Sequence, residues 1–185
     1  MKKHILRSLL FFALFSLVIP RGAPAFAATA NSPALSILTL SFVDNVTGLS
    51  QYTPKQGARF AIGDTCMIYL ETTGFTLHPV RPDSEDEFDL DLAVDIEIKM
   101  PQRRRVIVSE NNFHTLKTTM RSKLPIAFLA FGFPFDEDWT PGDYLIELTL
   151  RDNFSEQSVT ESMIYQLERP TDADLARQGE ESGTP

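Results

Sequence analysis

Cysteine is almost absent from this chain, and Cys66 is its only representative. A single cysteine cannot form an internal disulfide bond, so the fold has to be held together by other interactions. Cys66 also lies far from any signal-peptide cleavage point, which argues against a lipid-anchored protein. It belongs to the run Cys66-Met67-Ile68-Tyr69-Leu70, which predicts a small buried hydrophobic side chain, with a reactive thiol as the alternative.

Histidine is nearly as scarce, since the chain contains only His4, His78 and His114. A Ser-His-Asp site needs a histidine that a carboxylate orients beside a positioned nucleophile. The sequence contains no nucleophile elbow, no His-Glu-x-x-His motif and no Cys/His cluster. We therefore predict that the protein is not an enzyme, with His78 a solvated loop residue and His114 on an edge strand.

Basic residues are outnumbered, and the formal net charge is −8. Nucleic acids and anionic membrane surfaces are bound by proteins with a basic footprint, which a chain this acidic does not offer. We therefore predict no nucleic-acid partner.

Long hydrophobic runs are confined to the N-terminus. Three basic residues precede the apolar stretch Ser8–Ile19, and Ala25-Phe26-Ala27 fits the small-x-small rule for signal-peptide cleavage. The alternative is an uncleaved anchor, but the run is short of the roughly 20 residues that span a membrane. We expect residues 1–27 to be a signal peptide, the mature protein to have no transmembrane anchor, and its location to be periplasmic or secreted.

The remainder has the length of one domain. We predict a single domain over residues 28–168. Residues 169–185 combine proline, glycine and glutamate with little to bury, which predicts a disordered C-terminal tail.

Alternation of apolar and polar residues dominates that domain. In the segment 141–154, Tyr144, Ile146, Leu148 and Leu150 fall on one face, and Leu145 is the one apolar exception on the other. The same alternation runs through Phe88–Met100. With turn signals between about seven to nine such segments and no amphipathic helix, the sequence predicts an all-β, antiparallel sandwich.

Some segments are less clear. Residues 44–57 are rich in turn-forming residues and predict a connection, and Asn111-Asn112 is expected to end the strand that begins at Val106. Phe113–Met120 reads as an edge strand or a loop. The strand that begins at Thr65 is apolar on both faces and is expected to be central.

Two turn motifs carry a resemblance. Phe60-Ala61-Ile62-Gly63-Asp64 leads into one strand, and Pro141-Gly142-Asp143-Tyr144 leads into the penultimate strand. This pattern resembles the immunoglobulin-like and fibronectin-type-III-like domains of bacterial secreted proteins. The resemblance implies a structural corner at Pro141, Gly142 and Tyr144, in which the tyrosine hydroxyl bonds to backbone. It also implies a binding, spacing or accessory module.

Two acidic segments could bind a cation. The first contains Asp83, Glu85, Asp86, Glu87 and Asp89, a set of hard oxygen ligands of the kind that calcium prefers. It lacks the glycine of the EF-hand loop, and a solvated acidic loop is the alternative. We predict no cofactor, with calcium as the exception to be considered.

The second acidic segment is Asp136-Glu137-Asp138, followed by Trp139. The sequence leaves open whether it lies at the same end of the domain as the first, where the two could share an ion. An exposed Trp139 would suit a sugar face or a partner groove, and the alternative is that it anchors the loop. Arg103-Arg104-Arg105 is expected to be a solvated turn that balances neighbouring carboxylates.

These observations favour a non-enzymatic, periplasmic or secreted interaction module whose partner is another envelope or extracellular protein. The alternative is a ligand-binding module for carbohydrate or calcium that uses Asp136, Glu137, Asp138 and Trp139. Within this second reading, Asp83 to Asp89 would supply the metal ligands.

Overall fold

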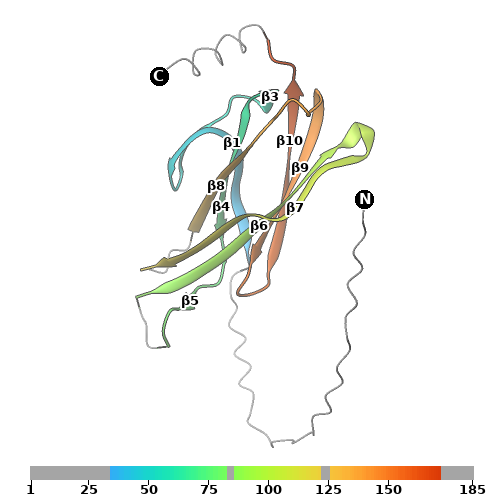
Figure 1. Ribbon diagram of the computed structural model, residues 1–185. Helices are drawn as coiled ribbons and strands as arrows, with labels where there is room; N and C mark the ends of the chain where they lie inside the picture. Colours follow the sequence, from blue (N-terminus) through green and yellow to red (C-terminus); the bar gives the residue numbers. More distant parts are fainter. Residues whose placement is uncertain (1–33, 83–85, 122–125, 172–185) are drawn as a thin grey trace, which may run out of the picture. The chain divides into compact units, whose positions relative to one another are not determined.

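The computed structural model describes residues 34–82, 86–121 and 126–171, and these form an all-β sandwich of ten strands (Figure 1). The prediction of an antiparallel-rich sandwich is confirmed, with one strand more than the upper end of the expected range. The expected signal peptide and all but three residues of the expected tail lie outside the described residues. None of the helices in the described ranges is long and apolar enough to cross a membrane.

The smaller sheet has the order β2-β1-β4-β8, with every neighbouring pair antiparallel. Its strands are β1 (Ser36–Gly48), β2 (Gln51–Pro54), β4 (Thr65–Thr73) and β8 (Ile126–Pro134). The prediction of a central strand from Thr65 is confirmed, because β4 buries Ile68 on one face and Tyr69 on the other.

The larger sheet has the order β3-β10-β9-β6-β5, and β7 pairs with β6 as well. Its strands are β3 (Arg59–Ala61), β5 (His78–Pro79), β6 (Phe88–Met100), β7 (Arg105–Met120), β9 (Gly142–Asp152) and β10 (Ser158–Glu168). Only the β3–β10 pair is parallel. Since β9 and β7 both follow β6 along most of its length, they occupy its two edges and make it the spine of this sheet.

The core lies between the two sheets, on the faces that the alternation predicts. Tyr144, Ile146, Leu148 and Leu150 are all buried, and burying each such side chain contributes roughly 1.5–3 kcal/mol. Cys66 is fully buried among them, as a small hydrophobic residue would be. Burial raises the pKa of its thiol to about 12, which leaves the thiol protonated and unreactive at neutral pH.

Two sequence expectations about strand ends are wrong. The segment 44–57 is a hairpin rather than an irregular connection, because β1 runs on to Gly48 and returns as β2. The strand β7 passes through Asn111-Asn112. Its second half, Phe113–Met120, is an edge strand paired with β6, which agrees with one of the two expected alternatives. At Asn112 the backbone has φ 55° and the N–H donates to Asp95. Pairing with β6 therefore turns a local break signal into a bulge.

Candidate functional site

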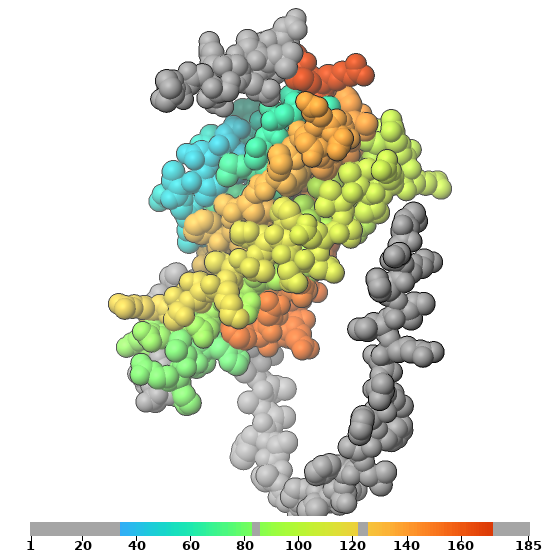
Figure 2. All heavy atoms as spheres, viewed as in Figure 1, coloured from blue at the N-terminus to red at the C-terminus, as the bar shows by residue number. Residues whose placement is uncertain are grey.

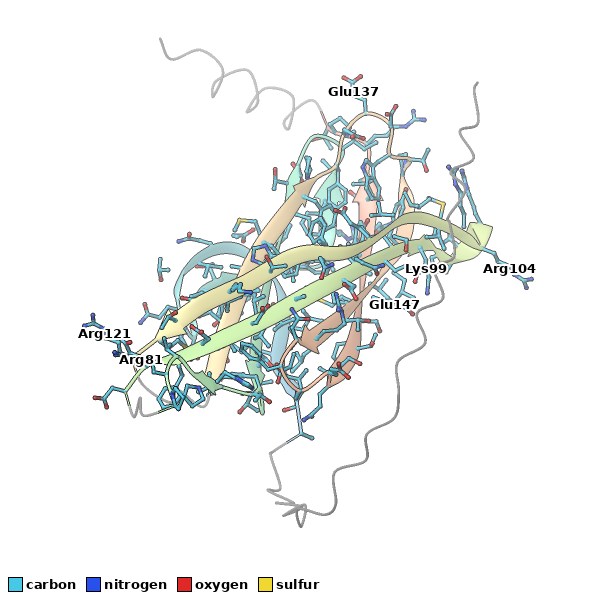
Figure 3. All side chains as sticks on the ribbon, turned by 60° about the horizontal axis from the view of Figure 1, so that its bottom comes forward. Arg81, Lys99, Arg104, Arg121, Glu137 and Glu147 are labelled. Carbon is cyan, nitrogen blue, oxygen red and sulfur yellow. The ribbon has the colours of Figure 1, made fainter. Side chains whose placement is uncertain are left out.

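The loop that carries Trp139 is packed onto the end of the core. The Trp139 ring lies 5.3 Å from the Phe135 ring and 5.4 Å from the Tyr144 ring, between centroids. The indole is half-buried there, and the structure places it in the anchoring role rather than on an open surface. Asp136, Glu137 and Asp138 are exposed, and Glu137 points away from the domain (Figure 3).

Below this loop, Tyr144 forms a corner at the start of β9. Its hydroxyl donates to the carbonyl oxygen of Thr140 at 2.6 Å, and its ring stacks on that of Tyr165 with 5.1 Å between centroids. Pro141 is exposed, and Gly142 has φ 153°, which favours glycine. The Tyr165 hydroxyl is buried with no hydrogen-bond partner among the described residues, and burial raises its pKa, so it stays neutral.

The first acidic segment lies at the opposite end of the sandwich. Phe88, next to it, begins β6, whereas Gly142, next to the Trp139 loop, lies against Met100 at the end of β6. The two acidic loops therefore cannot share an ion. In residues 34–82, 86–121 and 126–171, no cluster of three or more His, Cys, Asp or Glu side chains could hold a metal.

Of the five acidic residues proposed as metal ligands, Asp83 and Glu85 lie outside the described residues. Glu87 pairs with Arg81 at 3.8 Å, and Asp89 accepts a hydrogen bond from the hydroxyl of Thr119 at 2.6 Å. Asp86 is exposed. Glu87 and Asp89 are thus bound to different neighbours.

On the outer face of the smaller sheet, the polar groups of a buried network form hydrogen bonds with one another. Glu71 accepts hydrogen bonds from the Tyr69 hydroxyl at 2.5 Å and from the Ser50 hydroxyl at 2.7 Å and N–H at 2.9 Å. These bonds lower the pKa of Glu71, while burial and the bond to Glu71 raise the pKa of Tyr69 to about 12. The network holds the β1–β2 hairpin against β4 and offers no free group to a ligand.

A hollow of about 450 Å³ lies beside β3 and the end of β10, and most of the charged side chains that line it have partners. Arg59 pairs with Glu168 at 3.4 Å, and Lys55 pairs with Asp44 at 3.5 Å while lying over the Phe60 ring. The hollow thus presents few unsatisfied groups to a ligand.

The outer face of the larger sheet is ordered by ion pairs over most of its length. Arg151 donates to both carboxylate oxygens of Asp95, at 2.9 and 3.0 Å, and to the side-chain oxygen of Asn112 at 2.6 Å. Burial alone would raise the pKa of Asp95, but the bonds from Arg151 and Asn112 outweigh it and lower that pKa. Asp91 is held in the same way by Asn153 and Lys117.

One row of residues that crosses this outer face consists mainly of apolar side chains. Val106, Lys99, Leu145 and Ile164 are successive cross-strand partners on β7, β6, β9 and β10, and we call them the apolar row. Val106 is 49% exposed and Ile164 is 68% exposed. Lys99 pairs with Glu147 and, at 3.3 Å, with Glu97, so its charge is engaged and its methylene stem continues the row.

A groove of about 290 Å³ opens beside the apolar row, next to the β6–β7 turn. Its lining is mainly apolar, with two arginines at the rim. The lining residues are Met100, Pro101, Val106, Leu145, Lys99, Arg104 and Arg105. The groove combines apolar walls with the charges of Arg104 and Arg105, which form no ion pair with any described residue.

The turn itself, Pro101–Arg105, is the arginine tip. It consists of a 3-10 turn over Pro101–Arg103 and a left-handed Arg104 with φ 47°, whose N–H donates to the Pro101 carbonyl at 3.1 Å. Figure 2 shows this yellow-green hairpin end standing out from the body of the domain, and Figure 3 shows Arg104 at its extremity.

The expectation that the three arginines balance neighbouring carboxylates is wrong. All three are exposed, and in the described parts of the chain no acidic group lies within ion-pair distance of them. The Asp143 carboxylate accepts a hydrogen bond from the Gln102 side chain of the turn at 2.6 Å. The sequence signal for the row was Leu145, the apolar exception on a polar strand face.

Comparison with known proteins yields a fold-level likeness. No family model matches the chain, and no curated protein matches it. Among solved structures it is similar to the C-terminal domain of Wzt, with 13% sequence identity, a TM-score of 0.44, and 75% of each chain covered. The functional case therefore depends on the described residues of this chain.

Proposed function

We propose that the protein is a non-enzymatic, immunoglobulin-like interaction module, periplasmic or secreted, that docks another envelope or extracellular protein on its apolar row. The observation that carries this proposal is the alignment of Val106, Leu145 and Ile164 across four neighbouring strands, with the methylene stem of Lys99 between Val106 and Leu145. Scattered exposed apolar residues are ordinary on a protein surface. Here they are in register and adjoin a groove, which is the arrangement typical of a docking surface.

The size of the row suits a protein segment. Four neighbouring strands span roughly 14 Å between the outer two, at about 4.8 Å per step. Covering Val106 or Ile164 fully would contribute on the order of 1.5–3 kcal/mol each. The surrounding ion pairs, including Lys99–Glu147, would form a polar rim of the kind that surrounds the core of protein interfaces.

The alternative of a carbohydrate or calcium module has less support. Trp139 is engaged by Phe135 and Tyr144, and the two acidic loops lie at opposite ends of the sandwich. Neither feature provides the stacked sugar face or the shared carboxylate cage on which that alternative depends.

The proposal is tested by capture from the native envelope with the tagged, full-length chain. The variant Val106→Ser with Ile164→Ser removes the exposed apolar groups of the row. Leu38→Ser is the matched control, because Leu38 is 51% exposed but lies on β1 of the other sheet. We expect a captured partner to be lost from the double variant and retained by the control, with similar melting temperatures for all three proteins.

Capture that survives the double substitution, or that fails equally with Leu38→Ser, would contradict the apolar row as the docking surface. The location is tested separately, by mass analysis of the chain in the periplasmic or secreted fraction. We expect the mature chain to begin at Ala28, and an intact Met1 there would contradict cleavage.

A further inference from the structure

We propose that the arginine tip and the adjoining groove form a binding site for an acidic, extended peptide segment that inserts an apolar side chain. This inference rests on the proposed function, since it names the chemistry of the partner at one part of the docking surface. The partner's carboxylates would pair with Arg104 and Arg105, and its apolar side chain would lie between Met100, Val106 and Leu145.

The first argument is the state of the charges. Elsewhere on the same face, cationic side chains are paired: Arg151 with Asp95, Lys117 with Asp91, and Lys99 with Glu147. Three consecutive arginines on the tip have no such pair among the described residues. A guanidinium group binds a carboxylate through two parallel hydrogen bonds, so this cluster is chemically suited to glutamate or aspartate.

The second argument is the groove. Its volume of about 290 Å³ and its lining of Met100, Pro101, Val106 and Leu145 suit an apolar side chain rather than a larger ligand. Arg104 and Arg105 stand at the same rim. One ligand can therefore satisfy both the apolar walls and the charges only if it alternates acidic and apolar groups.

The third argument is that the tip is held in place. Gln102 donates to Asp143 on β9 at 2.6 Å, and the Arg104 N–H closes the turn onto Pro101. Met100, at the base, is only 2% exposed. Such a turn loses little conformational freedom when a ligand binds, which favours affinity.

The net charge of −8 orients the partner as well. An acidic segment is repelled by most of the domain and attracted at the tip, which gives one docking orientation. An anionic membrane shares part of this chemistry, but it presents a broad surface that the acidic body opposes. We therefore assign the site to a peptide.

The probe is a fluorescein-labelled short peptide of alternating glutamate and leucine, with a lysine–leucine peptide of equal length as its control. Binding to the full-length chain is followed by fluorescence anisotropy at low salt. We expect saturable binding of the acidic peptide only, and a marked weakening when salt is added.

Arg104→Glu with Arg105→Glu should weaken binding of the acidic peptide about tenfold or more. Arg121→Glu is the matched control, because Arg121 is equally exposed but lies at the other end of the domain (Figure 3). It should leave the affinity unchanged. Equal loss in both variants, or no binding of the acidic peptide by the parent chain, would overturn the inference.

Binding to vesicles with and without phosphatidylglycerol tests the remaining possibility, which is that the arginine tip binds an anionic membrane. Arginine-dependent binding to the anionic vesicles without peptide binding would replace the peptide site by a lipid site and overturn the inference. If the peptide does not bind while Val106→Ser with Ile164→Ser still abolishes partner capture, the acidic-segment inference fails and the proposed function stands. If the peptide binds but Val106→Ser with Ile164→Ser does not change partner capture, the acidic-segment inference stands and the proposed function fails.

Discussion

The two ends of one sheet face differ in how their charges are used. At the end near Asp91, Asp95 and Arg151, charged side chains are matched across strands and bond to one another. At the hairpin end, Arg104 stands on a turn and forms no ion pair with any described residue, and the exposed Val106 lies beside it. The same residue type thus stabilises the fold at one end and is free for a partner at the other.

The largest loss of stability is expected from a substitution in the core at the hairpin end of the sheet. Tyr144→Ala removes a ring packed on Tyr165 and Trp139, and should lower the free energy of unfolding by about 4 kcal/mol. Tyr144→Phe removes only the hydrogen bond to Thr140 and should cost about 1 kcal/mol. Urea unfolding measures both. An alanine variant as stable as the parent would show that this end is not held by the corner.

The next largest loss of stability is expected at the end of the sheet near Asp91, Asp95 and Arg151, where the charged side chains are paired. The Asp152 carboxylate, which is buried, accepts bonds from the Thr76 N–H, the Phe154 N–H and the Ser155 hydroxyl. Asp152→Ala leaves these donors unsatisfied and should cost about 3 kcal/mol in urea unfolding at neutral pH. The control is Glu137→Ala, an exposed carboxylate that should not change stability measurably.

Low pH should also destabilise the end of the sheet near Asp91, Asp95 and Arg151, because the nearby Asp152 carboxylate becomes protonated. Burial alone would raise the pKa of Asp152, but its hydrogen bonds lower it below the ordinary value of 3.8. A group whose pKa is lower in the folded state contributes stability fully above its unfolded pKa, and that contribution is lost as pH falls through the folded value.

We therefore expect the free energy of unfolding to fall as the pH is lowered from 5 into strongly acidic conditions. Asp152→Ala should show a shallower drop over the same range. An identical pH profile in the parent and in this variant would contradict the assignment to Asp152.

The smallest effect on stability is expected when one arginine at each end of the sheet face is replaced by alanine. Arg151→Ala breaks the bonds to Asp95 and Asn112 and should cost about 1 kcal/mol. Arg104→Ala breaks no ion pair that the described structure contains and should leave the thermal midpoint unchanged. Differential scanning calorimetry measures both. Equal destabilisation by the two substitutions would remove the distinction between the ends.

The candidate site was predictable only in part. Leu145 interrupts the polar face of its strand, and this exception is visible in the sequence. Nothing local indicates that Ile164 lies opposite Leu145, or that Val106 lies two strands away, because those relations depend on strand register. The sequence leaves the role of Trp139 open, because its neighbours Phe135 and Tyr144 come together only at the corner.

The sequence by itself determined the class of fold and the inner face of each long strand. Alternation with a period of two specifies which side chains can be buried, and that is a property of adjacent residues. The tertiary structure decided which charges are paired. Arg151 meets Asp95 through pairing between β9 and β6, whereas Arg103 and Arg104 stand on the turn between β6 and β7, outside the strand pairing. Charge pairing depends on distances between segments far apart in the chain, which only the assembled sheet defines.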